Sequence, residues 1–145
     1  NKKRRLICTN SNKTIAEALA IMNAHKVGAI LLTDESGENI VGIWTERDLM
    51  RNVMTEGFDI NKAIISDYMT KDLHSASFDT DIHALKEMIL SLFIRHILIE
   101  KDGRYVGMLS VGDIIRASLS AQDAHIEALK SHTSWHYYES WGWKA

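Results

Sequence analysis

Val41-Gly42-Ile43-Trp44-Thr45-Glu46-Arg47-Asp48-Leu49-Met50-Arg51 occurs a second time in the chain, as Val106-Gly107-Met108-Leu109-Ser110-Val111-Gly112-Asp113-Ile114-Ile115-Arg116. The two copies share valine, glycine, aspartate and arginine at matching positions. Each copy reads as an apolar strand, then a hydroxyl residue, then a helix with an aspartate in its first turn. A duplicated segment of this kind predicts a duplicated structural unit.

The hydroxyl and carboxylate pairs, Thr45 with Asp48 and Ser110 with Asp113, have two interpretations. Their spacing approximates a capping box, and the helix dipole favours an aspartate in a first turn. Alternatively, two equivalent helix starts present N–H groups and carboxylates to one cleft. Free N–H groups suit a phosphate, and a carboxylate suits a ribose diol. The sequence leaves both interpretations open.

The same elements surround each copy in the same order, which predicts two β-α-β-β-α units and an α+β fold. Thr14-x-x-Glu17 starts the first helix of the first unit, and Asp79-Thr80 starts the corresponding helix of the second. Thr14, Ala18 and Met22 match Thr80, Ala84 and Met88 at a constant offset. The predicted divisions are residues 1–56 for the first repeat, 57–72 for a partly helical bridge, 73–120 for the second repeat, and 121–145 for a C-terminal helix and an aromatic tail.

Composition limits the classes of function. With 17 basic and 19 acidic residues, the net charge of −2 does not favour nucleic acid or an anionic membrane as a partner. The single cysteine, Cys8, excludes an internal disulfide framework, and no apolar run approaches the ~18 residues of a membrane span. We expect a soluble, cytoplasmic protein. No nucleophile–base pair is visible, and His132 and His136 lack further metal ligands, so we expect neither an enzyme nor a metal site.

The repeated Gly-apolar-x-Thr/Ser-x-x-Asp pattern, the two β-α-β-β-α units, the bridge ending Ser66-Asp67-Tyr68-Met69-Thr70 and the segment Ile94-Arg95-His96-Ile97 together resemble a tandem pair of CBS domains. The resemblance covers residues 6 to 120. It implies two repeats related by pseudo-twofold symmetry that leave two clefts between them. It also implies a regulatory module that binds an adenosine-containing ligand such as AMP, ADP, ATP, NAD or S-adenosylmethionine and acts on an attached or associated protein. No cofactor is required; the adenosine nucleotide is a regulatory ligand.

Carried over by position, the resemblance gives each candidate residue a role. The two aspartates would hold ribose hydroxyls, the two hydroxyl residues would contact ribose or phosphate, and the entering strands with nearby backbone would frame adenine. Arg47 or the Arg95–His96 pair would supply charge for phosphate, so AMP or ATP is the expected ligand. The other repeat has glycine or alanine at these positions, and we therefore expect two unequal clefts. The candidate ligand-binding residues are Thr9, Ala29, Thr45, Arg47, Asp48, Ser75, Arg95, His96, Ile97, Ser110 and Asp113.

Two features depart from the family pattern or extend beyond it. Trp44 is large for its position, so it either packs in the core, stacks on a purine or fills the cleft; the core is favoured. If the clefts hold no ligand, the alternative function is a structural dimerisation module. The tail beyond residue 130 is rich in aromatic side chains, so it either folds back on its own pair or contacts another chain; a homodimer contact is favoured. These tail residues are Trp135, Tyr137, Tyr138, Trp141 and Trp143.

Overall fold

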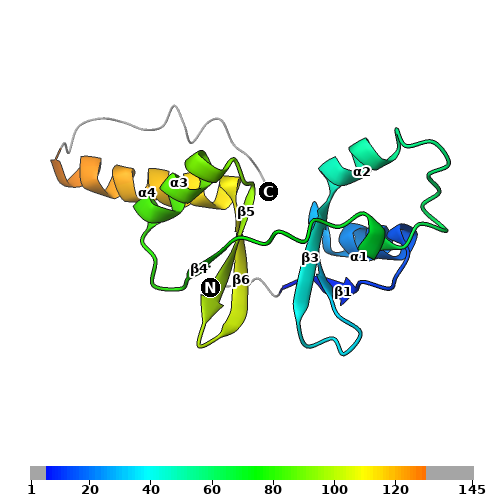
Figure 1. The fold of residues 1–145 in the computed structure, drawn as a ribbon. Helices are drawn as coiled ribbons and strands as arrows, with labels where there is room; N and C mark the ends of the chain where they lie inside the picture. Colours follow the sequence, from blue (N-terminus) through cyan, green and yellow to red (C-terminus); the bar gives the residue numbers. More distant parts are fainter. Residues whose placement is uncertain (1–5, 130–145) are drawn as a thin grey trace.

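The computed structural model describes residues 6–129, with side chains described through residue 120. It confirms an α+β fold built from two repeats, each with three strands and two α-helices (Figure 1). The predicted helix beyond Ser120 is present as the continuation of the last helix, whereas the aromatic tail lies outside the described residues. In chain order the elements are β1 Cys8–Asn10, α1 Ile15–His25, β2 Ala29–Thr33, β3 Ile40–Thr45, α2 Glu46–Asn52, the 3-10 helix η1 Ile65–Asp67, β4 Ser75–Ser77, α3 Ile82–Leu92, β5 His96–Lys101, β6 Arg104–Ser110 and α4 Val111–Leu129.

Each repeat contains a three-stranded sheet of the same topology. The orders are β1-β2-β3 and β4-β5-β6, with the first pair of strands parallel and the second pair antiparallel. Figure 1 shows the two sheets facing each other across the middle of the molecule, with α1 and α3 toward the outer sides. The segment after η1 crosses from one repeat to the other. The segments at the ends of β3 and β6, which carry Thr45 and Ser110, therefore lie at the space between the repeats.

The strand register defines which positions of the two repeats are equivalent. Ala29 pairs with Thr45 in the first sheet, and His96 pairs with Ser110 in the second. The backbone hydrogen bonds that start α2 and α4 are also equivalent: Glu46 N–H donates to Gly28 O, and Val111 N–H donates to Arg95 O, both at 2.9 Å. Gly28 and Ala29 thus occupy the positions that Arg95 and His96 occupy in the second repeat.

The starts of helices α1 and α3 show that the predicted match between Thr14 and Thr80 has to be corrected. Thr14 caps α1 through a bond from the Glu17 N–H at 3.2 Å, as predicted, but α3 is capped by Asp81, whose Oδ1 accepts from the Ala84 N–H at 2.8 Å. Thr14 therefore matches Asp81 and not Thr80, and the predicted correspondence was wrong by one residue. Asp81, rather than Thr80, is the N-cap of α3 because its carboxylate accepts a hydrogen bond from a helix N–H that would otherwise be unpaired.

Each repeat has its own apolar core. The first core contains Trp44, and the indole Nε1 donates to Asn52 Oδ1 at 3.0 Å, so the interpretation of this residue as core is confirmed. The bridge belongs to the same core, because Ile65 of η1 is fully buried there and Tyr68 packs against it. The second core is smaller and centres on three buried residues, Leu85, Ile97 and Ile114. Within residues 6–129, none of the helices has the length and apolar character that crossing a membrane requires.

Gly42 and Gly107, which match in the two repeats, should respond differently to an added methyl group. A Cβ at Gly42 would overlap the Met69 side chain of the bridge, whereas a Cβ at Gly107 would meet only Ile99 Cβ at 4.0 Å. We expect Gly42→Ala to lower the free energy of unfolding by about 1–3 kcal/mol because the site is overpacked. Gly107→Ala is the matched control and should change it by less than about 0.5 kcal/mol. Urea unfolding measures both; equal effects would contradict the close packing of the bridge on β3.

Candidate functional site

The larger cleft lies between the repeats and has a volume of about 780 Å³. One wall carries the start of α4 with Ser110 and Asp113, and the other carries the segment before β1 and the turn between α1 and β2. Seven candidate residues are thereby brought together: Ala29, Thr45 and Arg47 of the first repeat, and Arg95, His96, Ser110 and Asp113 of the second. The lining residues are Leu6, Ile7, His25, Lys26, Val27, Gly28, Ala29, Thr45, Glu46, Arg47, Arg95, His96, Met108, Ser110, Val111, Gly112 and Asp113.

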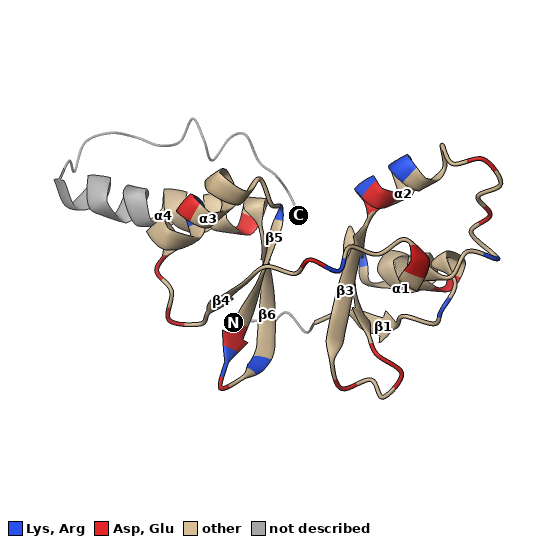
Figure 2. Ribbon diagram, viewed as in Figure 1, with Lys and Arg blue, Asp and Glu red and all other residues tan. Residues whose placement is uncertain are grey.

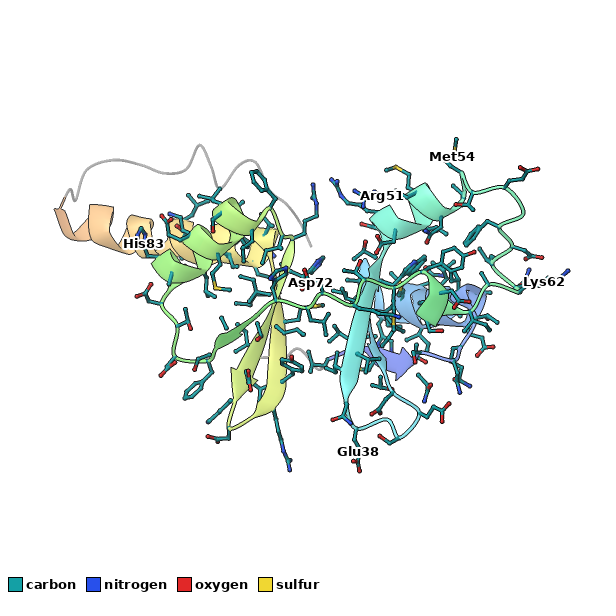
Figure 3. The ribbon with its side chains drawn as sticks, viewed as in Figure 1. Glu38, Arg51, Met54, Lys62, Asp72 and His83 are labelled. Carbon is teal, nitrogen blue, oxygen red and sulfur yellow. The ribbon has the colours of Figure 1, made fainter. Side chains whose placement is uncertain are left out.

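A smaller cleft of about 300 Å³ adjoins the start of α2 and contains Asp48. Asp72 lies on the crossing segment between the sheets, and Arg51 projects from α2 (Figure 3). The two clefts are therefore built from equivalent elements of opposite repeats and differ in size. The lining residues are Ile43, Thr45, Arg47, Asp48, Arg51, Thr70, Asp72, Leu73, His74, Phe93, Ile94, Arg95, His96, Leu98 and Met108.

The Thr45–Asp48 and Ser110–Asp113 pairs both form capping boxes. Asp48 Oδ2 accepts from the Thr45 N–H at 2.9 Å and lies 3.1 Å from Thr45 Oγ1, while the Asp48 N–H donates to that hydroxyl at 3.3 Å. The corresponding distances for Ser110 and Asp113 are 2.9, 2.9 and 3.1 Å. These contacts use one carboxylate oxygen of each aspartate. Because a carboxylate offers about four acceptor positions, capping is compatible with ligand binding.

Asp48 and Asp113 differ in the contacts of their second carboxylate oxygen, Oδ1. Asp113 Oδ1 accepts from Arg116 Nη2 at 2.7 Å, and the Asp113 side chain is only 15% exposed. Arg51, which follows Asp48 at the same spacing, lines the smaller cleft and makes no such bond within the described residues. The Arg116 side chain of this ion pair is 67% exposed, and pairs that water reaches in this way contribute about 0–1 kcal/mol. A ribose hydroxyl can therefore compete with it.

Cationic side chains flank both clefts. Arg47 and Arg95 are exposed, and each lines the larger and the smaller cleft. Figure 2 shows basic segments on α2 and at the start of β5 on either side of the space between the repeats. Burial lowers the pKa of His96 below its ordinary value of 6.5; Arg95 acts in the same direction, whereas Asp113 and Asp48 oppose the shift. His96 is thus neutral at neutral pH, and the arginines carry the positive charge.

The structure places three of the candidate ligand-binding residues outside both clefts. Thr9 pairs with Leu32 inside the first sheet, Ser75 is exposed at the start of β4, and Ile97 is fully buried in the second core; none is among the described residues lining either cleft. The segments immediately before the entering strands line the clefts instead: Leu6 and Ile7, and Leu73 and His74. Sequence reasoning missed these four because it assigned the adenine contacts further along the chain, to Thr9 and Ser75. The signal was their position directly before each entering strand.

The described residues outside the clefts provide little for other chemistry. They contain no group of three or more His, Cys, Asp or Glu side chains arranged to hold a metal ion. Burial raises the pKa of the Cys8 thiol, which opposes formation of a nucleophilic thiolate at neutral pH. The clefts, with their carboxylates, arginines and apolar walls, are therefore the features suited to binding a small polar ligand.

Comparison with known proteins adds independent information. The chain is 28% identical over 130 residues to the CBS domain-containing protein CBSX3, mitochondrial, of Arabidopsis thaliana, covering 88% of this chain and 63% of that protein. Its structure is similar to the crystal structure of the CBS-domain containing protein ATU1752 from Agrobacterium tumefaciens, with a TM-score of 0.73 and 32% sequence identity. This match covers 81% of this chain and 87% of that one. The chain thus spans less than two thirds of the plant relative.

A third similarity concerns a protein solved with ligands. The CBS domain pair of protein MJ0100, in complex with 5′-methylthioadenosine and S-adenosyl-L-methionine, is 26% identical, with a TM-score of 0.69, over 81% of this chain and 91% of that one. The family model of the CBS domain matches residues 3–55 and 65–120, which correspond to the two structural repeats. With both repeats matched and the fold shared, the chain belongs to the CBS domain family and carries a tandem pair of these domains.

Proposed function

We propose that this chain is a regulatory module that binds an adenosine-containing ligand, with AMP or ATP preferred, in the clefts between its repeats. The observation that carries the proposal is the larger cleft, where Asp113 and Ser110 face the Leu6–Ile7 segment of the other repeat. Its volume of about 780 Å³ falls in the range of small-molecule sites. The related MJ0100 pair, solved with two adenosine-containing ligands, supports the choice of ligand class.

The roles of the polar residues follow from their chemistry. Asp48 and Asp113 accept hydrogen bonds from ribose hydroxyls, and such charge-assisted bonds are about twice as strong as neutral ones. Arg47 and Arg95 neutralise phosphate, which accounts for the preference for a phosphorylated ligand. The apolar contacts of Ile7 and Val27 suit the faces of adenine.

The position of Trp44 supports a ligand-binding function over a ligand-free scaffold. A cleft filled by indole would exclude a nucleotide, but the Trp44 ring is fully buried in the first core and lines neither cleft. Exposed apolar residues on α2, directly after α2 and on α4 support, in addition, an interface with a second copy or a regulated partner. These residues are Met50, Val53, Met54, Ile115 and Leu119.

The direct test is thermal unfolding of the chain in the presence of AMP, ATP, NAD or S-adenosylmethionine. A ligand at 100 times its dissociation constant stabilises the folded state by about 2.7 kcal/mol, which raises the melting temperature by several degrees. We expect AMP or ATP to give such a shift and inosine monophosphate to give a smaller one. No shift with any adenosine compound, together with a dimer in light scattering, would favour the structural dimerisation module instead.

A further inference from the structure

The two clefts have a wall in common. Five residues line both of them, and only Arg47 and Arg95 among the five carry a permanent charge; the others are Thr45, His96 and Met108. The clefts are therefore not independent sites. Any ligand group that engages these two guanidinium groups in one cleft removes them from the other.

The charged side chains that line only one of the two clefts do not supply enough positive charge for a phosphate, so the two shared arginines are important. The larger cleft has Lys26 against Glu46 and Asp113, apart from its histidines. In the larger cleft, Asp113 is also paired with Arg116, which does not itself line the cleft. The smaller cleft has one cation, Arg51, against the carboxylates of Asp48 and Asp72. Without the shared arginines, the smaller lining carries a net charge of about −1, and the larger lining is about neutral once the Arg116 pair is counted. Neither lining then has surplus positive charge to attract a phosphate. With them, either lining becomes positive.

We propose that Arg47 and Arg95 serve the phosphate of only one ligand at a time, so that a phosphate-bearing adenosine ligand in one cleft weakens binding of a second such ligand in the other. This inference rests on the proposed function and adds a property to it. When AMP occupies one cleft, the affinity of the other cleft for a second ligand then depends on whether that ligand carries a phosphate. Adenosine, which has no phosphate, escapes the competition.

The contacts of the two arginines support this role. Within residues 6–120, neither guanidinium makes a hydrogen bond or an ion pair, in contrast to Arg116, which is held by Asp113. Both side chains are exposed, so either is able to turn toward one cleft or the other. Long, flexible cations that have no partner among residues 6–120 are suited to engage a phosphate, and a guanidinium does so with two parallel hydrogen bonds.

The asymmetry of the repeats explains why the arginines have to be shared. Arg47 and Arg95 match Gly112 and Gly28, so each repeat lacks one of the two cations. Gly112 lines only the larger cleft, and a Cβ there would lie no closer than 3.5 Å to Arg116 Nη1, an ordinary contact. Gly112→Arg would therefore supply the larger cleft with a cation of its own at little steric cost.

The test is isothermal titration of the full chain with AMP and, separately, with adenosine. For each ligand the ratio of the weaker to the stronger dissociation constant is determined, and the adenosine ratio corrects for the unequal shapes of the clefts. We expect the AMP ratio to exceed the adenosine ratio by about 10-fold, within the usual range of coupling between sites. Gly112→Arg should reduce this excess to less than about 3-fold, while Gly112→Ala, the matched control, should leave it unchanged.

The outcomes separate this inference from the proposed function. If adenosine and AMP both bind at two sites with the same ratio, the sharing of arginines is refuted while ligand binding stands. If neither compound binds, the proposed function fails as well. An excess that survives in both Gly112 variants and in Arg47→Gln would also refute the inference, because it would place the antagonism in another part of the molecule.

Discussion

Replacing Trp44 by alanine is expected to lower the free energy of unfolding by about 3–5 kcal/mol, the usual cost of deleting a large aromatic side chain from a core. The Trp44 side chain is fully buried and packs with residues from α1, β2 and the bridge. Its removal leaves a cavity that these rigid neighbours do not fill, and it leaves Asn52 without its indole partner. Urea unfolding followed by far-UV circular dichroism measures the loss.

Trp44→Phe separates the two contributions. Phenylalanine retains most of the apolar volume but cannot donate to Asn52 Oδ1, so we expect a loss of about 1–2 kcal/mol, the sum of a smaller cavity and one hydrogen bond. The response to AMP should persist in this variant because Trp44 lines neither cleft. A Trp44→Phe protein that keeps its stability but loses the AMP response would place the indole on the ligand instead.

Much of this fold was predictable from local sequence chemistry. The hydroxyl and the aspartate three residues later predict a helix start, and both capping boxes form because each satisfies an unpaired N–H of the first turn. Placement of Trp44 in the core also followed from its strand position. Such features depend on neighbours within a few residues, so the sequence contains nearly all the information that determines them.

The parts that were missed depend on contacts between distant segments. Matching Thr14 with Thr80 relied on residue identity, whereas the structure aligns the caps by function, Thr14 with Asp81. Likewise, the sharing of Arg47 and Arg95 follows only from the arrangement of the two repeats in space, because the residues lie in different units. No periodicity or spacing within one repeat indicates which side chains line two clefts at once.

Asp113→Ala should weaken AMP binding in the larger cleft by about 100-fold. The carboxylate is mostly buried and faces the cleft, and the loss of two hydrogen bonds to a charged acceptor costs about 3 kcal/mol in total. The same substitution removes the carboxylate half of the α4 capping box and the ion pair to Arg116, while the Ser110 hydroxyl still accepts from the backbone N–H of residue 113. The free energy of unfolding should therefore fall by only about 1 kcal/mol. Isothermal titration and urea unfolding of the same protein give both values.

Asp81→Ala is the matched control for this prediction. Asp81 caps α3 through a bond to the Ala84 N–H but lines neither cleft, so its loss should cost about 1 kcal/mol of stability and leave AMP affinity unchanged. The comparison therefore isolates the ligand contact from the cap. If Asp113→Ala and Asp81→Ala cost the same stability and both bind AMP like the unmodified chain, Asp113 acts only as a helix cap. Ribose recognition would then have to be assigned to other residues of the cleft.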